Sequence, residues 1–200
     1  MRDINFLIAG VGGQGTILAS DIMAEVGMLD GYDVKKTDVL GLAIRGGSVV
    51  SHIRWGEKVN APMSMRGKVD YLIAFEPIEA LRRVDFLNKE GTIIFNDYKI
   101  PPITVSSGLA TYPADGVIEK VLKESAKDVY RINATNKAVE IGNVKTVNVM
   151  MLGVLSVFLD VNIEIWEKAI KKFVPEKLIE DNLKTFYTGR EIIEIKEKLV

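Results

Sequence analysis

Apolar and polar positions divide the first half of the chain into segments that predict alternating strands and helices. Strands are predicted over 4–9, 69–75 and 92–97, where apolar residues are nearly continuous, and over 48–55, where they alternate with polar ones. A further strand-like segment, 33–40, follows Gly31 and precedes a glycine-rich loop. The alternation over 48–55 predicts that one face of this strand is more exposed to solvent than the other. Helical spacing of apolar residues predicts a helix over 14–29. Glu76-Pro77 marks the start of another helix, because proline suits a first helical turn.

The second half of the chain has mainly helical spacing. Paired prolines place 98–108 in a loop or at a sheet edge, since proline cannot donate to a central ladder. Further helices are predicted over 116–127, 145–159, 163–173 and 175–198. Strands that alternate with helices favour an α/β fold, with a Rossmann-like, mainly parallel sheet and a helical C-terminal extension over about 145–200. No linker divides the chain, so we expect one domain over 1–200, with its last helix packed on the domain or on a partner.

Composition and net charge limit the classes of partner that the chain is expected to bind. Its 200 residues are 48% hydrophobic, which is enough for a sizeable core, and its net charge of -1 gives no reason to expect nucleic acid or an anionic membrane surface. The longest apolar stretch, 147–159, is shorter than the roughly 20 residues that span a bilayer. We therefore expect a soluble, cytoplasmic protein.

Cysteine is absent from the chain, and His52 is its only histidine. The absence of cysteine excludes disulfides, cysteine-ligated iron–sulfur clusters, thiolate zinc sites and a cysteine nucleophile within this chain. We expect no metal site and no cofactor bound by this chain alone.

The sequence GVGGQG at 10–15 follows a predicted strand and precedes a predicted helix. Glycines allow a tight turn and a close approach of the backbone, and the N–H groups from Gly12 to Thr16 can receive a phosphate or carboxylate at the helix start. The alternative is a close strand-to-helix turn without a ligand. Four glycines within six residues exceed what a turn needs, which favours a functional loop.

A dinucleotide is one candidate for that anion. Asp38 lies near the place where an acidic residue would hold the ribose. Gln14 is a polar side chain that simple dinucleotide loops do not need, and a second glycine loop, AIRGGS, stands where a crossover helix is expected. No hydride-transfer constellation follows, so the dinucleotide is only the second interpretation.

Three motifs together resemble those of a known family. They are GVGGQG at 10–15, RGGSVVSHIRWG at 45–56 and GNVKTVNVMMLG at 142–153. The combination resembles the gamma-type subunits of 2-oxoacid:ferredoxin oxidoreductases. Within that family, RGGSVVSHIR is most similar to the beta subunits of indolepyruvate ferredoxin oxidoreductases. The resemblance runs from about Asn5 to about Gly189, nearly the whole chain.

The resemblance implies a subunit of a thiamine-diphosphate enzyme. That enzyme oxidatively decarboxylates a 2-oxoacid, here an indolepyruvate or other aryl pyruvate, to an acyl-CoA and passes electrons through iron–sulfur clusters to ferredoxin. It also implies that a larger partner subunit holds the thiamine diphosphate, magnesium and clusters, and that this chain is inactive alone and helps to close the active site. Coenzyme A is then a co-substrate.

We expect the two glycine loops to contact the 2-oxoacid or coenzyme A. The candidate residues are Gly10, Gly12, Gly13, Gln14, Gly15, Thr16, Arg45, Gly46, Gly47 and Ser48. Arg45 is the best candidate for a cation that contacts substrate, because its planar fork binds carboxylates and phosphates with two hydrogen bonds. The alternative is an arginine that bonds loop carbonyls or crosses a subunit interface. No catalytic residue is assigned.

Other polar residues have structural interpretations beside functional ones. His52 is more often a satisfied structural histidine than a base, and Glu76 either serves a ligand or favours a helix start. Asn143, Asn148 and the pair Met150-Met151 are expected at a subunit contact rather than in a cofactor site, because flexible thioethers adapt to such surfaces.

Two other functions remain open. The chain is alternatively a self-contained NAD(P)- or FAD-dependent oxidoreductase, or an assembly module whose loops contact only a partner.

Overall fold

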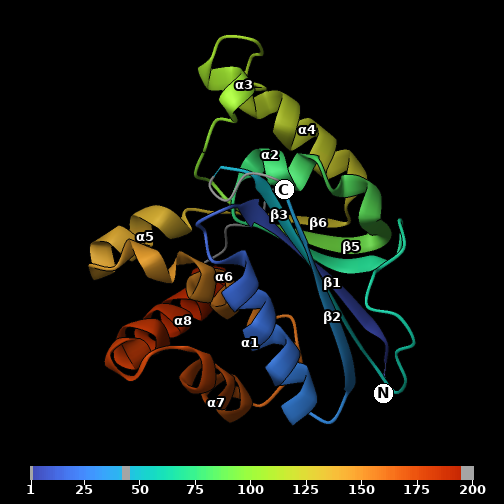
Figure 1. The fold of residues 1–200 in the computed structure, drawn as a ribbon, viewed down its shortest axis with the longest axis vertical. Helices are drawn as coiled ribbons and strands as arrows, with labels where there is room; N and C mark the ends of the chain where they lie inside the picture. The colour runs from blue at the N-terminus through green and yellow to red at the C-terminus, as the bar shows by residue number, and fades with distance from the viewer. Residues whose placement is uncertain (1, 42–45, 195–200) are drawn as a thin grey trace.

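A six-stranded sheet forms the centre of the molecule (Figure 1). The computed structural model describes residues 2–41 and 46–194. The strands are β1 (Ile4–Val11), β2 (Asp33–Leu40), β3 (Ser48–Gly56), β4 (Val69–Ala74), β5 (Leu87–Asn96) and β6 (Asp128–Ile132), in the spatial order β2-β3-β1-β4-β5-β6. β3 pairs antiparallel with both β1 and β2, whereas β1, β4, β5 and β6 pair in parallel. The prediction of a mainly parallel α/β sheet is therefore confirmed.

Helices cover both faces of this sheet (Figure 1). One face carries α1 (Thr16–Leu29), α6 (Val147–Ser156), α7 (Ile163–Phe173) and α8 (Ile179–Glu194). The other face carries α2 (Pro77–Leu81) and α4 (Asp115–Ser125), and the short α3 (Ile103–Ser106) projects beyond the end of α4. α5 (Ala134–Ile141) packs beside α6. The expected helical C-terminal extension is present over the described residues.

Among the strands and α-helices, β6, α5 and the short α3 were not predicted. β6 pairs with β5 and lies at the edge of the sheet, where only its Val129 and Ile132 are buried. A five-residue segment with two buried positions shows no clear apolar period, so the sequence did not predict it. β5 is also longer than predicted, beginning at Leu87. The paired-proline segment was predicted as a loop or edge, but it contains the four-residue helix α3.

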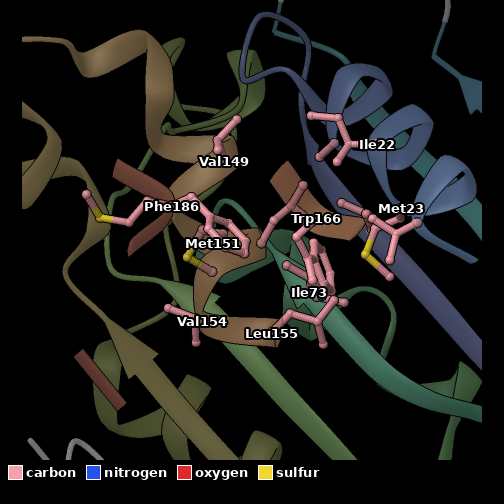
Figure 2. Packing of buried hydrophobic residues seen from close by; sticks show 14 of the residues in the cluster. Ile22, Met23, Ile73, Val149, Met151, Val154, Leu155, Trp166 and Phe186 are labelled. Atoms are coloured by element: carbon pink, nitrogen blue, oxygen red, sulfur yellow. The ribbon is translucent and has the colours of Figure 1, made fainter. Parts of the chain in front are cut away.

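The larger core lies between the sheet and the face covered by α1, α6, α7 and α8 (Figure 2). From Asn148 to Ser156, every residue of α6 is buried, which explains the long apolar stretch of the sequence. Met150 and Met151 are fully buried within this core. Their expected place at a subunit contact is therefore wrong, because the thioethers fill the interior of this chain instead.

The last helix packs on the domain through a glycine contact. Gly153 of α6 faces Gly189 of α8, and a Cβ on either residue would overlap a backbone carbonyl oxygen of the other helix. Without side chains at these two positions, the helices cross with their backbones touching. Arg190 then donates to the Ser156 hydroxyl, 2.7 Å between Nη1 and Oγ.

The chain leaves the sheet in opposite directions after β1 and after β4. β1 leads into α1 on one face and β4 leads into α2 on the other, so their carboxyl ends flank the point where the strand order reverses. Open α/β sheets bind ligands beside such a point. Within the described residues, no helix is both long and apolar enough to cross a membrane.

Candidate functional site

The first glycine loop joins β1 to α1 at this carboxyl edge. Gly13 and Gly15 have φ values of 104° and 78°, in the left-handed region that side chains disfavour. A Cβ on Gly10 would lie 2.6 Å from the Thr16 Oγ1, and one on Gly15 would lie 2.5 Å from the Asn148 Nδ2. The tight turn inferred from the glycines is present.

The Gln14 side chain fixes this loop to the end of β4. Its Oε1 accepts from the Val11 N–H at 2.7 Å, and its Nε2 donates to the Phe75 carbonyl at 2.9 Å. The Asn96 Nδ2 donates to the same carbonyl at 3.3 Å. Gln14 therefore links the ends of β1 and β4, where a ligand of an open α/β sheet would otherwise lie.

Three loop N–H groups remain available for a ligand. The Gly12 N–H donates to the Gly47 carbonyl and the Gln14 N–H to the Val11 carbonyl. Those of Gly13, Gly15 and Thr16 have no partner among the residues that the structure describes. The buried Thr16 Oγ1 has none either. The first turn of α1 contains no acidic side chain, so nothing there neutralises the positive end of the helix.

Two hollows flank the loop. The first, about 490 Å³, is lined by Val11, Gly12, Gly13, Gly15, Thr16, Ile17, Leu40, Gly41 and Val49. The second, about 400 Å³, lies toward α5 and α6. The first combines free N–H groups with apolar walls, which suits an anion attached to an apolar arm.

The second glycine loop leads into β3. Its Ser48 hydroxyl donates to Glu79 at 2.5 Å and accepts from the Arg83 Nη2 at 3.2 Å. Glu79 is buried and also pairs with Arg82 at 2.6 Å. Ser48 is thus held by side chains of the α2 region. Arg45 lies outside the described residues, so its role stays a prediction; Gly46 and Gly47 lie beside the first loop through the Gly12 bond.

His52 and Glu76 are both engaged within the fold. His52 is buried, and its Nδ1 accepts from the Ser64 N–H at 3.3 Å. Burial, together with the charge of Arg83, lowers the pKa of His52. Glu76 caps α2 by accepting from the Glu79 N–H, so it does favour a helix start.

The Glu76 carboxyl also accepts from the Tyr112 hydroxyl and from the Ile100 N–H. Burial raises the pKa of Glu76, while these donors oppose that rise. The carboxyl is therefore tied to the segment that follows β5.

The acidic residue considered for a ribose is also engaged. Asp38 accepts from the Ser51 hydroxyl at 2.5 Å and pairs with Lys36 at 3.0 Å. This pairing within the sheet counts against the dinucleotide interpretation.

Sequence reasoning named Gln14 but missed three other polar residues around the second hollow. Asn148 was expected at a subunit contact, but it is buried against the first glycine loop and donates to the Gly15 carbonyl at 3.2 Å. Lys145 and Tyr98 also line this hollow. The only available signal was the motif GNVKTVNVMMLG, which contains two of the three residues.

Candidate ligands for a metal ion or an iron–sulfur cluster were sought among the residues of the chain. There is no cysteine to ligate an iron–sulfur cluster. Over residues 2–41 and 46–194, no three histidine or acidic side chains gather to hold a metal ion.

Comparison with known proteins identifies the family. The model of the pyruvate ferredoxin/flavodoxin oxidoreductase family matches residues 5–192. The chain belongs to this family. The resemblance seen in the three sequence motifs is thereby confirmed.

Curated relatives match the chain over almost its whole length. The chain is 36% identical to the indolepyruvate oxidoreductase subunit IorB of Pyrococcus horikoshii, over 94% of this chain and 95% of the relative. It is 37% identical to the subunit IorB of Thermococcus kodakarensis, with the same coverage. It is 30% identical to the 2-oxoglutarate synthase subunit KorC of Methanothermobacter marburgensis, over 93% of this chain and 94% of the relative.

Solved structures share the fold. The keto/oxoacid ferredoxin oxidoreductase gamma subunit of Geobacter sulfurreducens superposes with a TM-score of 0.70 at 25% identity, covering 96% of this chain and 99% of that one. The 2-oxoglutarate:ferredoxin oxidoreductase of Magnetococcus marinus, solved with 2-oxoglutarate, coenzyme A and succinyl-CoA, has a TM-score of 0.76 at 18% identity. The match covers 98% of this chain and 32% of that one.

Proposed function

We propose that this chain is the small, gamma-type subunit of a 2-oxoacid:ferredoxin oxidoreductase that acts on indolepyruvate or another aryl pyruvate. The indolepyruvate oxidoreductase subunits IorB of Pyrococcus horikoshii and Thermococcus kodakarensis support an aryl pyruvate as the substrate, since both match the chain over nearly its full length. The reaction removes carbon dioxide from the 2-oxoacid, transfers the acyl group to coenzyme A and passes two electrons to ferredoxin.

The larger partner subunit supplies the redox and thiamine chemistry in this proposal. Thiamine diphosphate with magnesium, when bound there, would supply the decarboxylation chemistry, and iron–sulfur clusters would supply the electron transfer. The absence of cysteine from this chain supports such a division. We further propose that residues 1–200 act as one domain, in the cytoplasm, and only in the complex.

The start of α1 carries the proposed binding role. The N–H groups of Gly13, Gly15 and Thr16 and the buried Thr16 Oγ1 lack partners among the described residues, beside a hollow of about 490 Å³. A phosphate of coenzyme A or the carboxylate of the 2-oxoacid satisfies these donors at the positive end of a helix.

Other candidate residues shape this site. Gly10, Gly12 and Gln14 hold the loop in place, while Gly46, Gly47 and Ser48 support the neighbouring loop. Arg45 is proposed as a cation for the same anion, on the basis of its place in the sequence.

The test uses the complex reconstituted with its larger subunit. Thr16→Val removes the hydroxyl with little change of shape, and we expect the KM for coenzyme A or indolepyruvate to rise about tenfold, as for one hydrogen bond to an anion. Thr188→Val, on α8, is the matched control and should leave both KM values unchanged. For Arg45→Ala, unchanged KM values in an intact complex would contradict its substrate contact.

The rival functions predict different results. Micromolar binding of NADPH or FAD to the purified chain would favour a self-contained oxidoreductase. If Thr16→Val and Arg45→Ala both leave the KM values unchanged, the chain is an assembly module. Turnover of a 2-oxoacid by the isolated chain would contradict the proposed division between subunits.

A further inference from the structure

β2 is an edge strand whose outer side pairs with no strand that the structure describes (Figure 1). Directly after it, the Gly41 N–H donates to the Ser48 carbonyl, so the odd-numbered residues of β2 point their backbone groups toward β3. The N–H and C=O groups of the even-numbered residues, from Val34 to Leu40, therefore point outward. An open row of this kind is a template for one more strand.

A stripe of α1 lies over the same edge. Its residues stand at helical spacing and are exposed or half-buried, whereas most residues between them are buried: Ile17, Asp21, Ala24 and Met28. Ile17 and Met28 are 41% and 52% exposed. The Lys36 ammonium group pairs with Asp21, which places the stripe beside β2. The edge thus offers apolar side chains as well as open backbone groups.

We propose that this edge receives the β2 strand of a second copy of the chain, antiparallel to the first, about a two-fold axis at Thr37. In an antiparallel pair, residues directly opposite each other both point their backbone groups toward the partner strand or both point them away. A two-fold pairing therefore joins even-numbered residues of one copy to even-numbered residues of the other. This inference goes beyond the proposed function and does not depend on it.

Charge decides the position of the axis. With the axis at Thr37, Lys36 lies opposite Asp38 of the second copy, and Val34 lies opposite Leu40. Opposite charges, apolar pairs and facing threonines all stabilise paired strands. An axis one residue earlier or later would set two lysines or two aspartates against each other, which is destabilising. An axis nearer either end of β2 would leave part of both strands unpaired.

The same axis brings the α1 stripes of the two copies to one face of the joined sheet. Ile17 and Leu40 line one hollow, so α1 begins above the end of β2 and runs opposite to the strand. The two helices then run antiparallel above the paired strands and cover each other's apolar residues. Asp21 keeps Lys36 as its partner there, so the one acidic residue of the stripe is not left unpaired near the axis.

The absence of cysteine from the chain allows a direct test. Thr37→Cys places a thiol at the proposed axis, where facing Cα atoms are about 4.5 Å apart, within the reach of a disulfide. Under mild oxidation we expect a disulfide-linked dimer on a non-reducing gel. Lys35→Cys, on the same face of the same strand, is the matched control. Its two copies are about 13 Å apart in this register, so it should stay unlinked.

Hydrogen exchange followed by NMR tests the pairing without any substitution. The N–H groups of Lys36 and Asp38 bond only to the second copy, whereas that of Thr37 points toward β3. Dilution of the wild-type dimer should therefore speed exchange at Lys36 and Asp38 by roughly tenfold or more, with much less change at Thr37.

A charge at the axis should separate the two copies. Thr37→Lys sets two ammonium groups directly opposite each other, so we expect the Kd of the dimer, measured by sedimentation, to rise by roughly tenfold or more. Thr104→Lys, at an exposed position of α3, is the matched control and should leave the Kd unchanged.

Other outcomes overturn the inference. A wild-type chain that sediments as a monomer at every concentration does so, whatever the variants show. A dimer in which Lys35→Cys links as readily as Thr37→Cys, or in which dilution changes exchange at Lys36 and Thr37 alike, has another interface. In the reconstituted complex, the Thr37→Cys disulfide should join two small subunits. If it forms in the isolated chain but not in the complex, the larger subunit covers this edge and the inference fails.

Discussion

Where α6 crosses α8, Gly153 and Gly189 let backbone touch backbone, whereas at the carboxyl edge of the sheet Gly13 bends the chain through a positive φ into open space. A Cβ on Gly153 would overlap the Phe186 carbonyl oxygen, but a Cβ on Gly13 meets nothing within 4 Å. In the first region, the missing side chains let two helices pack with no space between their backbones. In the second, glycine lets the loop turn so that its N–H groups stay exposed. The same residue type therefore marks packing in one region and a candidate binding surface in the other.

The largest effect is expected at the helix crossing. Gly153→Ala places a methyl group against backbone atoms that cannot rotate away, so we expect the free energy of unfolding to fall by roughly 3 kcal/mol or more. Urea unfolding followed by circular dichroism measures this.

Gly116→Ala in α4 is the matched control, because a Cβ there meets nothing and φ is not positive. It should be neutral or stabilise by up to about 1 kcal/mol. Equal effects of the two substitutions would show that the helices do not cross as closely as the structure has them.

The next effect is expected at Gln14. Gln14→Ala removes the two hydrogen bonds that hold the first glycine loop, so we expect a loss of roughly 1–3 kcal/mol and faster hydrogen exchange at 11–16. Asn143→Ala, which removes the N-cap of the short turn before α6, is the control. Unchanged exchange at the loop would mean that Gln14 does not hold it and is free for the ligand contact predicted from the sequence.

A smaller loss of stability is expected at Gly13. Gly13→Ala meets no neighbouring atom, so only the positive φ opposes it, at about 1–2 kcal/mol. In the complex, the KM for coenzyme A or the 2-oxoacid should rise as well, because the loop relaxes away from its N–H geometry. A loss as large as that of Gly153→Ala would remove the contrast between the two regions.

The smallest effect depends on pH. Burial and the Arg83 charge lower the pKa of His52 below 6.5. Between the lowered value and 6.5 the unfolded chain binds more protons than the folded one, so the free energy of unfolding falls as pH falls through that interval. His52→Gln should flatten this slope. Proton NMR of the single imidazole measures its titration directly, and a midpoint at or above 6.5 would contradict the structure.

Local patterns predicted most of the fold. The second strand was predicted with the bounds it has, because Gly31 precedes the segment and a glycine-rich loop follows it. β6 was not predicted because this edge strand has five residues and buries only two side chains, which gives no clear apolar pattern. Met150 and Met151 were predicted at a subunit contact instead of in the core. A helix that is buried on all sides has no polar face, so its sequence does not show which residues point into the core.

The candidate site was predicted in outline only. The glycine loop and the helix it precedes followed from GVGGQG, and the family followed from three motifs. The sequence did not show that Ser48 is held by Glu79 and Arg83, or that Asn148 lies at the loop. These partners are far apart along the chain, and no local period records them.

The sequence by itself determined the alternation of strands and helices, the glycine turn of the first loop and the family, because each depends on neighbouring residues. Only the tertiary structure decided what the polar side chains do. Gln14 meets a carbonyl 61 residues away, and Asn148 meets one 133 residues away. The folded sheet brings these groups together at one edge, and there it leaves the Asn148 oxygen without a partner.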